Sequence, residues 1–531
     1  MNLFRHDHKL TIATVLLSAS CCGWAGTAVR GQGTSGSLGY RSARFSPAAK
    51  ELLSNQQKFH ESRDLKRKVM AGDEPFAANE ELLKTWYVGL NFPMMTRTRG
   101  GNGAPADAVE NLERMRVLLL KDIGQARDKQ FRGWLIQQVI KIMPTVAKGN
   151  YHPIVRYNAM LTVANLNQSE AGVTSAAKRR PPVPLPAAFA ILQDALTSDQ
   201  QIDAVRVAAL TGILRHVELD PFSSRPLADD VKHSLADDLL SIVQASDPPA
   251  MRDPGVHYWM RLRATEILGR LQSPDQEGKI ADALGEIVND EQLKRRLRCA
   301  AGEAIGRTGR LPSSYVSEPT ALAVAISKLA NAASQEAVEH IGEISLVAEQ
   351  QTRLEPGLMS RNKDTDVMMP PRGLGDPDEE TSPRRRTEIR KLDWEKELEL
   401  ARRTLLTTLA AVNRGLQGAD KKGGVLAVAQ NEPHTTNIAR LGDAIGALVE
   451  TCDTKYEEVD ELLADLREVS GQLESEIDQL ERATEEADEA VPDEAVPDEA
   501  DPENGQAVVA SGDQPVADGE GAAEEQPIDF Q

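Results

Sequence analysis

The sequence predicts an all-α protein, for two reasons. Aromatic residues make up only 4% of the chain and charged residues 27%, a composition that suits helices better than strands rich in aromatic and β-branched residues. Apolar residues also recur every three or four positions over most of the chain, which is the spacing of one helix face. We expect a central array of helix pairs, then a long amphipathic helix with coiled-coil periodicity, and finally a disordered acidic tail.

Residues 1–28 have the layout of a secretory signal peptide. A basic start precedes the apolar run Leu10–Ala19, and Gly26–Ala28 offers a small-x-small cleavage site. The run is shorter than the about 20 residues of a membrane span, and no other stretch of the sequence looks long and apolar enough for one. Cys21 raises the alternative of a lipid anchor, but Ser18 takes the place where a lipoprotein signal has an aliphatic residue. We therefore expect export to the periplasm or the exterior, without a membrane span.

The rest of the chain divides by composition. Gly and Ser dominate a flexible leader, prolines interrupt a linker between helical regions, and Asp and Glu fill a tail without any Lys or Arg. The predicted parts are a flexible leader at 29–44, N-terminal helices at 45–106, a repeat region at 107–345, a loop or linker at 346–386, C-terminal helices with a coiled coil at 387–483, and a disordered acidic tail at 484–531.

Four helices of the central region have the same pattern around an arginine. An apolar residue precedes the arginine, an alanine lies three positions after it, and Val, Ile or Leu lies seven positions after it. These offsets fall on one helix face, and an Asp or Asn upstream of each helix suits a cap or turn. A second predicted helix precedes each arginine helix, so the unit is a helix pair. The four arginines are Arg156, Arg206, Arg261 and Arg298.

This pattern resembles the HEAT-repeat family, over roughly residues 107–340. The resemblance implies an α-solenoid with a groove that binds proteins, built from at least three stacked repeats. It also implies that the repeated arginine usually has a structural task. In that interpretation each guanidinium forms a rung of a ladder, bonding to a carboxylate or a turn carbonyl of its own or the next repeat.

The alternative for the arginines is a basic stripe that lines the groove and binds an anionic ligand. The net charge of the chain is −20, and the 16 Asp and Glu residues of 483–531 account for most of it. The body before the tail is therefore near neutrality at about −4, which favours the ladder over the stripe. A neutral body and an acidic tail also argue against nucleic acid as a partner.

Residues 451–483 predict a helix with a coiled-coil seam, because apolar side chains recur at heptad spacing. Two arrangements stay open. The seam joins two copies of the chain in a homodimer through 451–483, or it packs on a helix of its own chain such as Lys391–Leu416. The predicted seam residues are Val459, Leu462, Leu466, Val469, Leu473 and Leu480.

No motif for catalysis, a cofactor or a metal ion is found. The sequence has no HExxH, no phosphate-binding loop, no GxSxG and no Rossmann glycine pattern. After signal removal only Cys299 and Cys452 remain, far apart and in no zinc-site spacing. We therefore expect no catalytic residue, no cofactor and no metal site.

The function that these observations favour is an exported, non-enzymatic scaffold that binds another protein through a HEAT-like groove. The identity of that protein is not encoded in any recognisable motif. Two alternatives remain: an enzyme-like HEAT protein of the lyase or chaperone type, and a structural spacer of the cell envelope that acts through its coiled coil.

Overall fold

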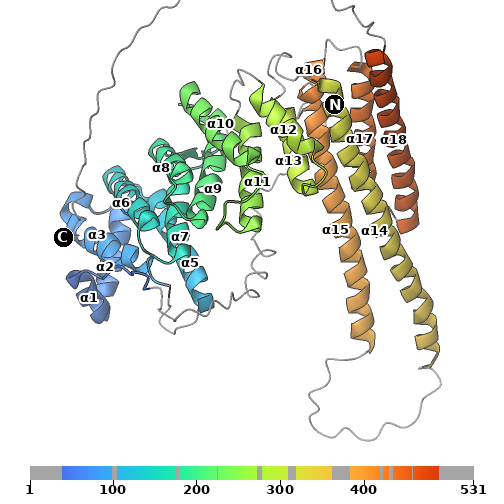
Figure 1. Cartoon of the computed structure of the whole chain (residues 1–531). Helices are drawn as coiled ribbons and strands as arrows, with labels where there is room; N and C mark the ends of the chain where they lie inside the picture. Colours follow the sequence, from blue (N-terminus) through green and yellow to red (C-terminus); the bar gives the residue numbers. More distant parts are fainter. Residues whose placement is uncertain are drawn as a thin grey trace, which may run out of the picture. The chain divides into compact units, whose positions relative to one another are not determined.

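A computed structural model describes residues 39–98, 105–173, 179–223, 225–271, 278–308, 318–361, 383–418, 423–429, 435–456 and 458–489 (Figure 1). Within these ranges the chain is mostly helical, so the prediction of an all-α protein is confirmed at that level. Residues 1–483 form one compact unit; the second unit, 484–531, is described only as far as Glu489. The predicted signal peptide, most of the leader, residues 362–382 of the linker and the tail after Glu489 lie outside the described residues.

The N-terminal helices begin at Ser46, whose hydroxyl accepts from the Ala49 amide and caps the first helix. Asn55 caps the second in the same way, and Gly72, with φ +82°, ends it in the left-handed conformation. The elements are α1 (Pro47–Ser54), α2 (Gln56–Ala71), α3 (Phe76–Trp86), the π-helical turn η2 (Tyr87–Asn91) and α4 (Phe92–Met94).

Four helix pairs follow in the region where the sequence predicts repeats. The first and second helix of each pair pack on one another, and the second helices also pack in series, α7 on α9, α9 on α11 and α11 on α13. The elements are α5 (Pro105–Gln125), α6 (Lys129–Lys148), α7 (Pro153–Ala164), α8 (Pro186–Thr197), α9 (Asp203–Leu219), the 3-10 turn η3 (Asp220–Phe222), α10 (Asp229–Gln244), α11 (Pro254–Leu271), α12 (Lys279–Asn289) and α13 (Arg295–Thr308). The pairs are α6 with α7, α8 with α9, α10 with α11, and α12 with α13.

Between α7 and α8 the chain forms two short antiparallel ladders that the sequence did not predict. Strand β1 (Asn167–Ser169) pairs with β4 (Val183–Pro184), and β2 (Gly172–Val173) pairs with β3 (Arg179–Arg180). The insertion is therefore a small folded hairpin, and its β4 strand packs on α9.

The C-terminal region is a group of long helices. They are α14 (Pro319–Arg361), α15 (Pro383–Gln417), the short α16 (Gly424–Val428), α17 (Thr435–Asp453) and α18 (Val459–Glu489). Helices α14 and α15 pack side by side, and α17 packs on α15 (Figure 1). The linker expected from residue 346 starts later than predicted, because α14 continues as a helix to Arg361.

Helix α18 runs antiparallel to α14. The Ser345 hydroxyl donates to Asp460 at 2.9 Å, the hydroxyls of Ser334 and Ser470 lie 2.7 Å apart, and Lys328 pairs with Glu481. Partner numbers fall along α18 as they rise along α14, which defines the antiparallel direction. Of the predicted seam, Leu462, Leu466, Leu473 and Leu480 are buried, and Val459 and Val469 are half-buried. The described structure thus buries the seam within its own chain, where α14 supplies its polar contacts.

No helix in the described part of the chain has both the length and the hydropathy that a bilayer crossing requires. The core is one continuous apolar cluster that extends from α1 through the helix pairs into α18.

Candidate functional site

The four repeated arginines all bond to the helix that precedes their own. Each donates to a backbone carbonyl at or near the last turn of that helix, where carbonyls have no partner inside the helix. A guanidinium there also complements the negative end of the helix dipole. The bonds are Arg156 Nε to Ala147 at 2.7 Å, Arg206 Nη2 to Ser198 at 2.8 Å, Arg261 Nε to Val243 at 3.0 Å and Arg298 Nε to Val288 at 2.9 Å.

These contacts join the two helices of one pair. Arg156 also reaches the following pair, because its Nη2 donates to Gln201 Oε1 at 3.1 Å. Arg261 is the most enclosed of the four, and burial lowers its pKa. Each arginine of the first column therefore donates to a backbone carbonyl of its own helix pair.

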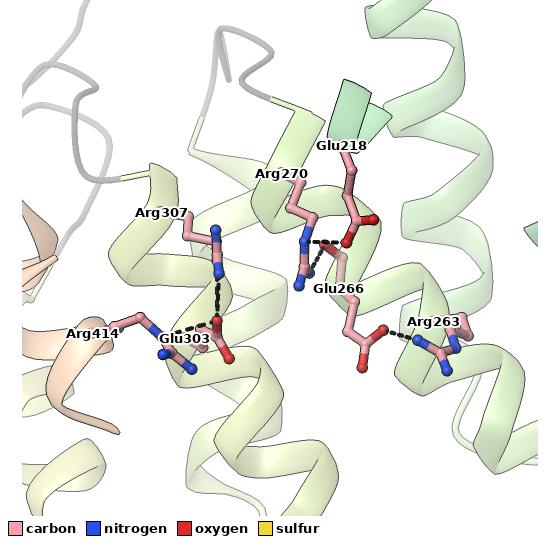
Figure 2. Close-up of polar contacts among 7 residues, drawn as sticks. All are labelled: Glu218, Arg263, Glu266, Arg270, Glu303, Arg307 and Arg414. Atoms are coloured by element: carbon pink, nitrogen blue, oxygen red, sulfur yellow. Dashed lines mark hydrogen bonds and ion pairs between the residues drawn. The ribbon is translucent and has the colours of Figure 1, made fainter. Parts of the chain in front are cut away.

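A second arginine column lies nine residues after the first and was missed in the sequence. Its members are Arg215 on α9, Arg270 on α11 and Arg307 on α13. Arg215 donates to the Ala164 carbonyl and to Asn167, at the end of α7. Arg270 pairs with Glu218 of α9 at 3.1 Å (Figure 2). Arg215 and Arg270 therefore connect neighbouring second helices, whereas Arg307 pairs with Glu303 of its own helix. The first column, in contrast, connects the helices within a pair.

The sequence does contain a signal for the second column. The segments RLRATEILGR, starting at Arg261, and RCAAGEAIGR, starting at Arg298, share a glutamate five residues after the first arginine and the second arginine nine residues after it. Those glutamates are Glu266 and Glu303, and both belong to the charged group in Figure 2.

Glu303 is the point where α15 meets the last helix pair. Its Oε1 accepts from Arg307 Nη2 at 2.7 Å and pairs with Arg414 Nε of α15 at 3.1 Å (Figure 2). Burial alone would raise the pKa of Glu303, but the hydrogen bonds and charges of the two arginines together lower it. Glu303 is therefore held as a carboxylate between two guanidinium groups.

Glycines let α13 and α15 approach closely beside this ion pair. A Cβ on Gly306 would meet the Arg414 carbonyl oxygen, and one on Gly415 would lie 2.7 Å from the Gly302 carbonyl oxygen. Only hydrogen at these positions leaves room for the partner backbone. Helices α13 and α15 consequently cross with their backbones in close contact.

The corresponding face of α7 is covered in a similar way by α5. Arg116 of α5 donates to Asn158 of α7 at 2.8 Å, and Asn158 is buried. Asn158 lies two residues after its repeat arginine, and Glu303 lies five after its own, so the two belong to one helix face. At both ends of the stack, then, a helix of the chain itself covers the face of a second helix.

Between these ends, no helix in the described part of the chain covers the same face of α9 and α11 in this way. Helix α5 packs on α7 and α15 packs on α13, and neither has extensive contact with α9 or α11. On α11, Arg263 and Glu266 pair with each other at 2.5 Å, and the Arg263 guanidinium lies 5.1 Å from the Trp259 ring centroid. We call this surface the open face; its residues are Thr211, Leu214 and Glu218 of α9 and Trp259, Arg263, Glu266 and Arg270 of α11.

A separate polar cluster fastens the N-terminal helices. Asp122 Oδ2 accepts from Lys66 Nζ and from the Tyr87 hydroxyl, both at 2.8 Å. Burial, followed by the charge of Asp122, raises the pKa of Tyr87 well above its ordinary value. Tyr87 is fully buried against Phe131, so the cluster joins α2, η2 and α5 without exposing the phenol.

Within the described residues no group of three or more His, Cys, Asp or Glu side chains is placed to hold a metal ion. The two cysteines are buried free thiols, and burial raises the pKa of both Cys299 and Cys452 to about 11. Thiols with so high a pKa are poor nucleophiles at neutral pH.

Comparisons with protein-family models, with characterised proteins and with solved structures give no match to this chain. The resemblance to HEAT repeats therefore depends on the residues of this chain alone.

Proposed function

We propose that this protein is an exported, non-enzymatic scaffold that binds another protein through one face of a HEAT-like α-solenoid. The observation that carries the proposal is the open face of α9 and α11. It lies between two positions that the chain fills with its own helices, α5 on α7 and α15 on α13.

Two features support the solenoid. The helix pairs repeat, and each second helix packs on the next one, which is how stacked repeats bury a continuous core. The two arginine columns supply matching bonds within pairs and between them. Regular contacts of this kind hold a stack at constant spacing and leave the outer side chains free to vary.

The open face also has the chemistry of a protein-binding surface. Trp and Arg are enriched among residues that dominate binding energies at protein interfaces, and here Trp259 lies under Arg263. The carboxylates and guanidiniums of the face are paired in the free protein, so the surface is stable in water without a partner.

Export is supported by the sequence of residues 1–28, with its basic start, short apolar run and small-residue site. Self-association through 451–483 is not part of the proposal, because the seam leucines are buried within the chain. We propose that the seam residues pack α18 against the other C-terminal helices of the same chain.

The proposal is tested by photo-crosslinking in the cells that make the protein. A benzophenone amino acid replaces Thr211, which is exposed on the open face. The matched control places it at Ser241, which is exposed on the first helix α10. We expect a discrete adduct with another protein from position 211 and none of that mass from 241. Absence of an adduct at 211, or the same adduct at both positions, would refute binding through the open face.

A further inference from the structure

The outer surface of helix α5 carries exposed apolar side chains. Arg116 marks the inner side of the helix, because it donates to Asn158 of α7, and Asp122 marks it towards η2. On the remaining surface three large apolar side chains are exposed, more than on any other helix or strand in the described part of the chain. They are Val109, Val117 and Leu118. Exposed apolar side chains gathered on one helix are typical of a surface that another protein covers.

The charged side chains around Val117 follow an order that complements itself. Glu113 lies one turn before Val117 and Lys121 one turn after it, and all three side chains are exposed. Because a helix rises 1.5 Å per residue, each charge lies about 6 Å from Val117 along the helix axis. A second α5 that runs antiparallel and crosses at Val117 therefore brings its Lys121 to Glu113 and its Glu113 to Lys121.

We propose that the outer face of α5 binds the same face of a second copy of this chain, in an antiparallel pair with two-fold symmetry. The axis of symmetry passes at Val117, with Leu118 beside it. Every contact of such an interface occurs twice, so two Glu113–Lys121 ion pairs flank the two valines. This surface is separate from the open face of α9 and α11, and a monomeric protein would leave the proposed function unaffected.

Glu113 keeps its charge available for a second copy. Arg116 Nη2 lies 3.8 Å from Glu113 Oε1, which is longer than a hydrogen bond. The guanidinium of Arg116 is instead directed inwards, where its Nη1 donates to Asn158. The side chain of Glu113 is 51% exposed, so a lysine from another chain can approach it.

Charge also determines the direction of the second helix. A parallel copy would bring Glu113 to Glu113 and Lys121 to Lys121, and like charges at short range repel one another. The exposed residues Glu110 and Arg114 extend the same order, because both acids precede both bases along α5. The antiparallel direction is therefore the one in which acids meet bases.

The small contact area predicts weak association. A single crossing of two helices buries less than the about 1,200 Å² at the lower limit of stable protein interfaces. We expect a dissociation constant on the order of 10 to 100 µM. Because the ion pairs lie at the surface, dimerisation should weaken as the salt concentration rises.

The test is sedimentation equilibrium at low salt with the chain from residue 29 to 531. Glu113→Lys and Lys121→Glu each place like charges opposite one another, so each variant alone should dimerise about tenfold more weakly than the wild type. An equimolar mixture of the two variants restores both ion pairs and should form a mixed dimer about as tightly as the wild type. Glu80→Lys on the exposed surface of α3 is the control for net charge and should dimerise as the wild type does.

A wild type that stays monomeric would overturn the proposal. So would a mixture of the two variants that associates no better than either variant alone, because antiparallel pairing requires the opposite charges to meet. Association of the wild type that is unaffected by either substitution would assign the dimer to another surface.

A second measurement locates the axis of symmetry. Cys299 and Cys452 are buried, so Val117→Cys supplies an exposed thiol. Packed helices bring two such residues on a two-fold axis within reach of a disulfide. Mild oxidation with diamide should therefore crosslink Val117→Cys into a dimer, and Ser241→Cys on α10 should stay monomeric. Equal crosslinking of the two variants, or none of Val117→Cys, would contradict the proposed axis.

Discussion

At the scale of single residues, the helix pairs depend on side chains that are buried with their polar groups directed at specific partners. Arg261 is the clearest case, because its guanidinium is enclosed while its Nε donates to the Val243 carbonyl at 3.0 Å. Buried polar groups of this kind are costly to leave unpaired. The contribution of such a hydrogen bond to the free energy of unfolding can therefore be measured by removing the donor.

Arg261→Met keeps most of the length of the side chain and removes the donor. We expect the free energy of unfolding to fall by about 2 kcal/mol, because the Val243 carbonyl loses a charged donor. Arg403→Met on α15 is the control, since the Arg403 side chain is 74% exposed and pairs with Glu399 one turn away; it should cost about 0.5 kcal/mol or less. Urea titration of both variants measures the difference, and equal losses would show that Arg261 adds nothing beyond its aliphatic stem.

His216 of α9 makes the stability depend on pH. Burial first, and then the charge of Arg215, lowers the pKa of His216 from its ordinary 6.5 to about 4. In the unfolded chain the imidazole gains a proton below about pH 6.5, whereas in the folded chain it stays neutral down to about pH 4. The unfolded state therefore binds more protons in that window, and the free energy of unfolding falls as the pH is lowered through it.

The expected loss from His216 between pH 6.5 and 4 is about 3 kcal/mol. It is measured by comparing unfolding of the wild type with His216→Gln at pH 7 and at pH 4.5, so that carboxylates common to both cancel. The variant should lose less stability on acidification than the wild type. Identical pH dependence of the two proteins would mean that His216 is not held neutral.

At the scale of elements, close crossings decide how the last helix pair meets the C-terminal helices. Gly306→Ala would place a methyl group against the Arg414 carbonyl oxygen. Helix α15 cannot shift away from that methyl group without breaking the ion pair between Arg414 and Glu303. We expect a loss of about 2 kcal/mol or more, as for overpacking in a core. Gly342→Ala in α14 meets nothing within 4 Å and should stabilise by up to about 1 kcal/mol. Thermal unfolding of the two variants should shift in opposite directions; a shift in the same direction would argue against the close crossing.

The seam of α18 is predicted to act within one chain. Leu466 is fully buried, and Leu466→Ala should lower the free energy of unfolding by about 2–5 kcal/mol. Light scattering should give the same molar mass for the variant and the wild type, because the side chain faces its own chain. A halved mass in the variant would instead assign the seam to a dimer.

Local patterns in the sequence predict helices well but not their long-range partners. The helix predicted before the Arg156 helix is α6 (Lys129–Lys148), whose apolar spacing and Asp128 cap are both local features of the sequence. The second arginine column could also have been predicted, since Arg215, Arg270 and Arg307 lie nine residues after the arginines of the first column. The contact between α15 and α13 could not have been predicted, because Arg414 and Glu303 are over a hundred residues apart in the sequence.

Two further differences have the same origin. Helix α14 continues to Arg361, whereas the sequence predicts a linker from residue 346. The ladders at Asn167–Pro184 were not expected, because strands of two or three residues are too short to show a period of two. The open face of α9 and α11 was not predictable either, because it is recognised only by comparison with α7 and α13, which α5 and α15 cover.

At the scale of the whole molecule, the net charge and the folded core lie in different parts of the chain. Residues 484–531 form a unit apart from 1–483, and the tail after Glu489 contributes Asp and Glu but no Lys or Arg. The apolar core, in contrast, continues through α18 to Leu480. Stability should therefore depend on α18 and not on the tail that follows it.

Two truncations separate these parts. Removing 490–531 should leave the midpoint of thermal unfolding unchanged, because the core of the described residues, which ends at Leu480, is kept whole. Removing 459–531 also deletes Leu462, Leu466, Leu473 and Leu480, all buried, and each buried leucine is worth about 1.5–3 kcal/mol. The longer truncation should lower the midpoint sharply and expose the apolar surface that α18 covers, which a hydrophobic dye would report. If the shorter truncation destabilises the protein as much as the longer one, the tail belongs to the fold, and the division between charge and core is wrong.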